Sequence, residues 1–291
     1  PKAGRRRLTQ VLGKILATLA QEGFAVEPLP TAGPGEATAM ARDLAAQGRV
    51  EVVFAFGGDG TVREVAAGLL GSRVALGVLP GGTVNLLAHS LGLPRNPVRA
   101  AALLARLPSR ALDVGLAGDS PFLMMVSAGL DTHILAALDQ DWKSRFGKAA
   151  VVLQGLREWW RYGYPRLELT ADGLPCGATF AAVSNIAFYG GPFQFAPGAR
   201  PDDRQLDLVL FRGSGRAATL GFVLGVIGGL HTRRRDVSVQ PADEVVLTGP
   251  AGTPVQVDGD LCRETLPVRI RLSPERLLVL SPEGVPVPAH R

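Results

Sequence analysis

The fold is decided by one stretch, Val50-Glu51-Val52-Val53-Phe54-Ala55-Phe56-Gly57-Gly58-Asp59-Gly60-Thr61. In it, an apolar run passes directly into a turn rich in glycine. The residues after the turn have the spacing of one apolar helix face: Val62, Val65, Ala66, Leu69 and Leu70. The pattern therefore predicts a buried strand, a glycine turn and a helix. Glycines let the backbone approach an anion, and the N–H groups at a helix start point toward it, so this junction is typical of a phosphate site.

Asp59 is unexpected in a site for phosphate alone, because its carboxylate repels the anion. A carboxylate beside polyphosphate fits a site where it binds Mg²⁺ or accepts a proton from an attacking hydroxyl group. The two neighbours of Asp59 are glycines, which give it no cationic partner. A functional role for Asp59 is therefore favoured over a structural one.

A second junction of the same kind follows, where Val74–Leu79 leads into Pro80-Gly81-Gly82-Thr83-Val84-Asn85. Adjacent parallel strands place their carboxyl-end loops side by side, which is where open α/β sheets bind ligands. Either loop alone is explained by a tight turn in which Thr61 or Asn85 caps the next helix. The two loops together, with an acid in the first, predict one shared ligand site.

The chain resembles the diacylglycerol kinase catalytic domain and its relatives, which include sphingosine kinases, ceramide kinases and bacterial lipid kinases. The resemblance covers nearly the whole chain. Beyond the two glycine motifs, it rests on Leu112-Asp113-Val114-Gly115, Ser127-Ala128-Gly129-Leu130-Asp131, Tyr189-Gly190-Gly191, Asp202-Asp203 with Leu206-Asp207, and Asp258-Gly259-Asp260. The first glycine motif also occurs in NAD kinases and phosphofructokinases, whereas the second and the downstream series favour lipid kinases.

The resemblance implies ATP and Mg²⁺ as cofactors and assigns roles to particular residues. It implies that Asp260 works with Asp59, either as general base or by organising the magnesium waters. It suggests contact of Asp131 with the substrate and a structural cation near Asp203 and Asp207. The residues implied to hold the nucleotide are Gly4, Gly57, Gly58, Gly60, Thr61, Glu64, Gly81, Gly82, Thr83 and Asn85.

Two departures from the family pattern and one feature of the start bear on these roles. Arg204 follows Asp203 where the family usually has glycine, and Asp260 replaces the usual glutamate. From the residues alone, Asp258-Gly259 is typical of a hairpin turn. Pro1-Lys2-Ala3-Gly4 resembles the end of the family's nucleotide loop, so we expect the numbering to start inside the fold.

The pattern of elements predicts an α/β domain followed by an all-β domain. Residues 1–108 alternate helices and strands, with a strand at Phe24–Leu29 and a helix at Ala37–Ala46, which is typical of a layered, parallel α/β nucleotide domain. Residues 109–274 hold short strands typical of an antiparallel β-sandwich, interrupted by helical stretches at Trp142–Tyr162 and Ala217–Leu230. The resemblance implies that residues 275–291 return to the first domain, with a strand at Leu277–Leu280. It also implies that the sandwich binds lipid and that the active site lies in the cleft between the domains.

The net charge is compatible with docking on an anionic membrane surface. The chain has 291 residues and a net charge of +5, and a basic surface attracts anionic lipid headgroups. Aromatic residues are only 6%, and no zinc-finger spacing occurs, so nucleic acid is disfavoured as a partner.

The two cysteines and the longest apolar run bear on where the protein works. Cys176 and Cys262 form no disulfide framework, which favours a reducing compartment. The apolar run Ala217–Leu230 is too short to span a bilayer. We expect a cytoplasmic protein on the inner face of the membrane, docked through the aromatic and basic stretch Arg157–Arg166.

The sequence thus predicts an ATP-dependent lipid kinase. It would transfer the γ-phosphoryl group to a hydroxyl of a diacylglycerol-like, sphingoid-like or ceramide-like lipid. Two alternatives stay open, an NAD-kinase-like phosphotransferase on a soluble nucleotide and a catalytically inactive lipid-binding module. The sequence does not decide whether Asp59 or Asp260 is the base, which lipid is the acceptor, or whether the protein is a homodimer.

Overall fold

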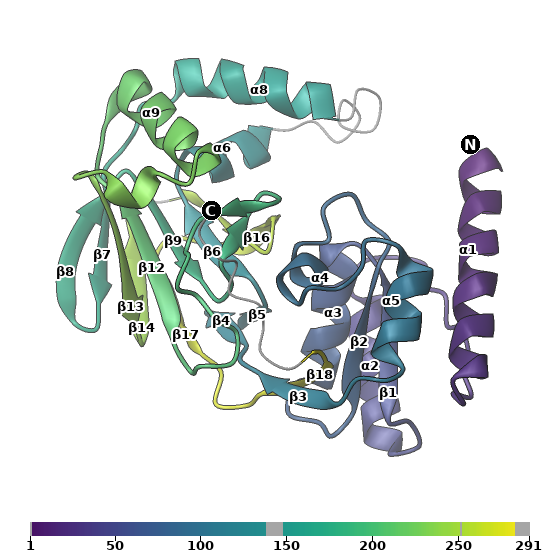
Figure 1. Ribbon diagram of the computed structural model, residues 1–291. Coiled ribbons are helices and arrows are strands. Elements are labelled where there is room, and N and C mark those ends of the chain that lie inside the picture. The colour runs from purple at the N-terminus through teal and green to yellow at the C-terminus, as the bar shows by residue number, and fades with distance from the viewer. Residues whose placement is uncertain (1, 138–147, 251, 283–291) are drawn as a thin grey trace. The chain divides into compact units, whose positions relative to one another are not determined.

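The computed structural model describes residues 2–137, 148–250 and 252–282 (Figure 1). The chain forms two compact units. Unit 1 comprises Pro1–Asp113 and Pro274–Arg291, and unit 2 comprises Val114–Ser273. Each unit has its own sheets and its own hydrophobic core.

Unit 1 is a layered α/β structure with a four-stranded sheet in the order β1-β2-β18-β3. β2 (Ala75–Pro80) is parallel to β1 (Val52–Gly57) and to β18 (Leu277–Leu280), while β3 (Ser109–Leu112) is antiparallel to β18. Every residue of β2 is buried, as expected for a strand paired on both edges in a sheet covered by helices. The helices are α1 (Lys2–Gln21), α2 (Glu36–Gln47), α3 (Asp59–Leu69), α4 (Leu86–Ser90) and α5 (Pro97–Leu104). The predicted parallel α/β architecture is thus confirmed.

The register of β1 and β2 fixes where the glycine loops begin. Phe56 pairs with Leu79, and Gly57 pairs with Pro80. The two strands therefore end at the same level, and the loops that follow them leave from the same edge of the sheet. This edge is the carboxyl end of the parallel strands, as the sequence predicts.

One local prediction for unit 1 is wrong. Phe24–Leu29 forms no strand, although the ring of Phe24 packs edge-on against Phe54 of β1 at 5.7 Å between centroids. β1 is at the sheet edge, and Pro28 and Pro30 lack the N–H groups that a further strand would have to donate. Gly4 lies in the first turn of α1, and its role at the nucleotide stays a prediction.

Unit 2 is a sandwich of two six-stranded sheets in which every strand pair is antiparallel. One sheet has the order β13-β12-β9-β6-β15-β16 and the other β5-β4-β17-β14-β7-β8. The core between the sheets includes Phe122, Val183, Leu208, Leu247 and Ile270. The strands are β4 (Gly115–Ala117), β5 (Ser120–Phe122), β6 (Met125–Ala128), β7 (Leu167–Ala171), β8 (Leu174–Ala178), β9 (Phe180–Ser184), β12 (Leu206–Phe211), β13 (Val237–Ala242), β14 (Glu244–Thr248), β15 (Pro254–Val257), β16 (Asp260–Thr265) and β17 (Val268–Leu272). The predicted antiparallel sandwich is confirmed.

A second apolar cluster lies on the outer face of the β12-containing sheet. Strand residues such as Phe180 and Phe211 meet Phe195 and Phe222, and the rings of Phe211 and Phe222 stack at 4.4 Å. The covering elements are α6 (Leu130–Ala137), the hairpin of β10 (Phe188–Tyr189) and β11 (Phe193–Gln194), α9 (Gly215–Ile227) and the 3₁₀ turn η1 (His231–Arg233). A further helix, α8 (Lys148–Arg161), packs against α6. Both predicted helical stretches are present, except that residues 142–147 of the first lie outside the described residues.

Candidate active site

The two glycine loops of unit 1 touch each other. The N–H group of Gly81 donates to the carbonyl oxygen of Gly57 at 2.8 Å. A Cβ atom on Gly82 would lie 2.6 Å from Cα of Gly58, which is closer than real Cβ contacts allow. Only a residue without a Cβ at position 82 therefore permits this approach, so Gly82 is needed for the loops to form one surface.

Asn85 holds the second loop in shape. Its Oδ1 accepts from the N–H group of Gly82 and its Nδ2 donates to the carbonyl oxygen of Gly82, each at 2.8 Å. Its backbone has a φ of 54°, a left-handed conformation that asparagine tolerates better than most residues. Both polar groups of the side chain are thus engaged with the loop, so Asn85 fixes the position of Gly82.

Asp59 connects the two loops. It is the first residue of α3, and its Oδ1 accepts from the N–H group of Leu87 in α4 at 3.3 Å. No side chain caps the start of α3, so the N–H groups of its first turn remain for another acceptor. Among the described residues, no hydrogen bond to Oδ2 of Asp59 is present. A half-buried carboxylate with a free oxygen beside uncapped amides fits a magnesium–phosphate ligand, since Mg²⁺ is commonly bound by one or two carboxylates and the substrate phosphates.

The other predicted nucleotide residues of unit 1 lie in or next to these loops. Gly60 is the second residue of α3, and Thr61 packs so closely over Gly57 that a Cβ there would lie 2.6 Å from its Oγ1. Glu64 lies one turn further along α3 and is half-buried, whereas Thr83 is exposed in the second loop. Gly4 is separate from this group in sequence and lies in α1.

The Asp258-Gly259 turn of unit 2 is a hairpin turn, as the residues alone indicate. φ is 52° at Asp258 and 88° at Gly259, and Val257 pairs with Asp260 across the turn. The buried carboxylate of Asp258 accepts three backbone hydrogen bonds, from the N–H groups of Leu123, Met124 and Met125. Asp260 is exposed at the start of β16. Asp59 belongs to unit 1 and Asp260 to unit 2. A joint catalytic role of the two carboxylates therefore stays a prediction.

Asp203 and Asp207 form a pair of neighbouring carboxylates at the start of β12. Oδ1 of Asp203 accepts from the N–H group of Gln205 at 3.1 Å. Burial, together with the negative charge of Asp203, raises the pKa of Asp207 to about 6. Arg204 has a φ of 63°, so the chain keeps a left-handed turn here without the family's glycine. Among the described residues, no three His, Cys, Asp or Glu side chains group in a way that could hold a metal ion, so a cation at this pair stays a prediction.

A largely apolar pocket of about 300 Å³ lies within unit 2. Its walls come from α6, β9, β12, α9 and the β10–β11 hairpin, and include Phe180, Phe195, Phe211, Phe222, Val226 and Ile227. Asp131 is the only charged side chain among the described residues that line it. A pocket of this kind fits an apolar chain with one polar group near its end.

The carboxylate of Asp131 is held by hydrogen bonds from three sides. Its Oδ2 accepts from the hydroxyl groups of Ser127 and Tyr189, the latter at 2.7 Å, and its Oδ1 accepts from the N–H group of Thr132 at 2.7 Å. Burial raises the pKa of Asp131, although these hydrogen bonds oppose the shift. Burial also raises the pKa of Tyr189 well above its usual value, with the charge of Asp131 adding to the effect. The sequence signalled Asp131 and Tyr189 through their motifs but gave no sign of the aromatic residues that meet around them.

Known proteins match both units. Residues 1–117 match the diacylglycerol kinase catalytic domain, and residues 124–281 match the YegS C-terminal NAD kinase beta sandwich-like domain. A probable lipid kinase YegS-like of Pseudomonas aeruginosa is 32% identical over 87% of this chain and 83% of its own length. A diacylglycerol kinase of Bacillus subtilis is 26% identical over 89% of this chain and 87% of its own. The crystal structure of a candidate diacylglycerol kinase from Bacillus anthracis superimposes with a TM-score of 0.81, at 26% identity, over 96% of this chain and 92% of that one.

These matches define the class of the protein as a lipid kinase, an enzyme that transfers phosphate to an alcohol group. The chain belongs to the diacylglycerol kinase catalytic-domain family, and its second unit is the YegS-type sandwich. The resemblance on which the sequence prediction rests is thus confirmed. The alternatives of a kinase for a soluble nucleotide and of an inactive lipid-binding module receive no support.

Replacing Gly82 with valine is expected to weaken ATP binding at least about ten-fold, that is by about 1.4 kcal/mol. The new side chain must displace the backbone of Gly58, which separates the two loops and spoils the phosphate surface. Isothermal titration with ATP and Mg²⁺ measures the effect. Gly33→Val is the matched control, because a Cβ at Gly33 meets nothing within 4 Å. An unchanged ATP Kd in a folded Gly82→Val protein contradicts a phosphate role for the loop.

Proposed function

We propose that the protein transfers the γ-phosphoryl group of ATP to a hydroxyl group of a lipid of the diacylglycerol-like, sphingoid-like or ceramide-like class. The observation that carries this proposal is the pocket in unit 2, whose described lining is apolar except for a few hydroxyl groups and one hydrogen-bonded carboxylate. The apposed glycine loops of unit 1 support ATP as the donor.

Unit 1 supplies the phosphate-binding half of the reaction. The uncapped amides of α3 and the exposed backbone of Gly81 and Gly82 would hold the phosphates. Mg²⁺, when bound, would neutralise charge on the transferring group, and Asp59 would hold it. Positioning and charge stabilisation supply most of the catalysis in phosphoryl transfer, so the rigidity that Asn85 and the Gly58–Gly82 contact give this surface serves the chemistry directly.

Unit 2 would bind the lipid acceptor in its apolar pocket. Each CH₂ group of an acyl chain that leaves water for the pocket contributes about 0.8 kcal/mol, so the aromatic walls favour long chains. Ser127 and Tyr189 both donate to Oδ2 of Asp131, whereas Oδ1 accepts from the N–H group of Thr132. The Asp131 carboxylate, the charged group of the pocket lining, would accept the hydrogen of a lipid hydroxyl. Asp59 or Asp260 takes the proton of the reacting hydroxyl, and the choice between them stays open.

The proposal is tested by offering ATP and Mg²⁺ with a panel of acceptors: diacylglycerol, monoacylglycerol, a sphingoid base, ceramide, phosphatidylglycerol and NAD. We expect transfer to at least one lipid and none to NAD. Asp131→Asn is expected to raise the KM for that lipid at least about ten-fold, because an amide replaces the carboxyl group that would hold the lipid hydroxyl, while the KM for ATP stays the same. Asp119→Asn is the control, since Asp119 is an exposed carboxylate in the β4–β5 turn of the same unit. Transfer to NAD alone, or to no acceptor at all, rejects the proposal.

A further inference from the structure

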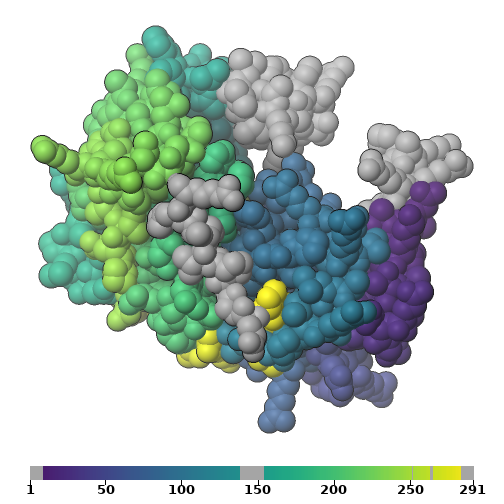
Figure 2. All heavy atoms as spheres, in the orientation of Figure 1, coloured from purple at the N-terminus to yellow at the C-terminus, as the bar shows by residue number. Residues whose placement is uncertain are grey.

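The outer face of α9 is apolar and exposed. Leu220, Val223, Leu224 and Ile227 recur at the spacing of one helix face and are each between 44% and 58% exposed. Leu230, just beyond the helix, is also exposed. The segment lies at the molecular surface of unit 2, in green, with α9 labelled on the ribbon (Figures 1 and 2). Contiguous exposed apolar side chains of this size mark an interaction surface.

The opposite face of α9 is buried on the sheet. Phe222 packs in the cluster with Phe180, Phe195 and Phe211, and Thr219 is buried beside it. The helix is therefore apolar on both faces, a pattern that belongs to helices covered on both sides. Within the described residues the outer face has no such cover.

The exposed face and the lipid pocket share side chains. Val223 and Ile227 line the pocket and are also about half exposed, whereas Leu220 and Leu224 are exposed without lining it. A single layer of side chains thus separates the pocket from the outside at α9. An acyl chain that enters here passes from one apolar environment to another without crossing water.

Cations stand at both ends of this apolar face. At one end, Arg216 occupies the same helix face as Leu220, and its guanidinium lies 3.9 Å above the ring of Trp160, a largely exposed residue of α8. At the other end, Arg233 and Arg235 are exposed after η1. No acidic residue occurs between Leu208 and Arg235, so the charges within this segment are of one sign. A tryptophan and arginines at the rim of an apolar helix are typical of a membrane interface.

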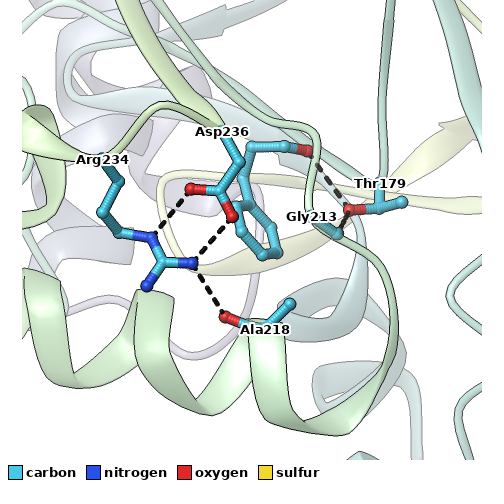
Figure 3. A network of polar contacts seen from close by, with 6 residues as sticks. Thr179, Gly213, Ala218, Arg234 and Asp236 are labelled. Carbon is cyan, nitrogen blue, oxygen red and sulfur yellow. Dashed lines mark hydrogen bonds and ion pairs between the residues drawn. The ribbon is translucent and has the colours of Figure 1, made fainter.

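Arg234, which lies between Arg233 and Arg235, forms contacts within unit 2. Arg234 pairs with Asp236 at 2.7 Å and reaches the carbonyl oxygen of Ala218 in α9, as Figure 3 shows. In the same view, the hydroxyl group of Thr179 donates to the carbonyl oxygen of Gly213, just before the helix. These contacts attach α9 to the sheet beneath it, so the helix and its exposed outer face are held in place.

We infer that α9 docks on an anionic phospholipid bilayer, with its outer face among the acyl chains and with Arg216, Arg233 and Arg235 at the lipid phosphates, and that the substrate enters the pocket past Val223 and Ile227. The entry route rests on the proposed function, whereas the docking does not. This surface differs from the expected stretch Arg157–Arg166. Of the four aromatic residues there, Tyr164 is buried and Trp159 donates to the carbonyl oxygen of Arg216, and only Trp160 is exposed.

The test uses the double variant Leu220→Glu/Leu224→Glu, which places two charges on the outer face without touching the pocket lining. Sedimentation with phosphatidylcholine vesicles that contain about one third phosphatidylglycerol measures docking. We expect binding at least about ten-fold weaker than that of the unmodified protein. Leu174→Glu is the matched control, since Leu174 is 70% exposed on β8 of the same unit, and it should bind as the unmodified protein does. Arg233→Gln/Arg235→Gln is expected to bind less tightly and with a weaker dependence on salt.

Activity distinguishes docking from entry and from the proposed function itself. Leu220→Glu/Leu224→Glu should lose transfer to a long-chain lipid in vesicles and keep transfer to a water-soluble short-chain analogue. Vesicle binding equal to that of the unmodified protein, in a variant shown by circular dichroism to be folded, overturns the docking surface. Weakened binding with undiminished transfer to the long-chain lipid overturns the entry route. If the unmodified protein phosphorylates no lipid while the variant still loses vesicle binding, the proposed function fails and the docking stands.

Discussion

Replacing Asp59 with asparagine is expected to lower kcat at least about a thousand-fold, an effect in the range seen when a catalytic acid–base or metal-binding group is removed. The substitution keeps the shape of the side chain and an oxygen that can accept from the N–H group of Leu87. It removes the negative charge that either holds Mg²⁺ or accepts the proton. The first turn of α3 and its contact with α4 should therefore survive, so that the loss is chemical rather than structural.

Steady-state phosphoryl transfer to the best lipid acceptor measures this loss, and thermal unfolding verifies the fold. Glu36→Gln is the matched control, because Glu36 is also a carboxylate at the first position of a helix in unit 1 and accepts from backbone N–H groups. It should retain full activity. If Asp59 holds the metal, the variant also needs more Mg²⁺ for half-maximal ATP binding. A folded Asp59→Asn protein with nearly normal kcat shows that Asp59 has no such role.

The glycine loops could be predicted because their signals are local. A strand pattern, a glycine turn and a helix pattern follow one another at residues 50–70, and they do so again after residue 74. Two parallel strands then bring the loops to one edge of the sheet, where Gly57 pairs with Pro80. What the sequence could not predict is that Gly58 and Gly82 are in contact, since that depends on the register of two strands.

The failure in unit 1 concerns a segment whose structure depends on a partner. Phe24–Leu29 has apolar alternation, but a strand also needs a neighbour to pair with and free N–H groups, and Pro28 and Pro30 remove two of these. There the local pattern and the long-range pairing gave different answers.

The pocket was beyond prediction for a different reason. Phe180, Phe195, Phe211 and Phe222 are typical core residues by composition, and nothing in their spacing shows that they surround a cavity rather than fill it. Only the packing of α9 and the β10–β11 hairpin against the sheet decides that. Asp258 was likewise predicted only as a turn residue, although its carboxylate makes the most extensive set of buried backbone contacts described in unit 2.

Replacing Asp258 with alanine is expected to lower the free energy of unfolding of unit 2 by at least about 3 kcal/mol. The N–H groups of Leu123, Met124 and Met125 lose their acceptor while they stay buried, and each such loss costs roughly 1–3 kcal/mol. Alanine also tolerates the left-handed backbone at this position poorly. Asp258→Asn keeps one acceptor oxygen and suits the turn, so its loss should be smaller. Urea unfolding followed by tryptophan fluorescence reports on unit 2, because both described tryptophans, Trp159 and Trp160, lie in α8.

Asp172 provides a control in which the turn is the same and only burial differs. It precedes Gly173 in the β7–β8 turn, has a φ of 50°, and its Oδ1 accepts from the N–H groups of Asp243 and Glu244, but it is exposed. Water can accept from these two N–H groups in place of the Asp172 carboxylate. Asp172→Ala should therefore lower the free energy of unfolding by only about 1 kcal/mol. Equal losses for Asp172→Ala and Asp258→Ala would mean that turn geometry, and not the buried acceptor, stabilises the hairpin. Because Asp260 directly follows the Asp258-Gly259 turn, its catalytic role can be read only from variants in which Asp258 is intact.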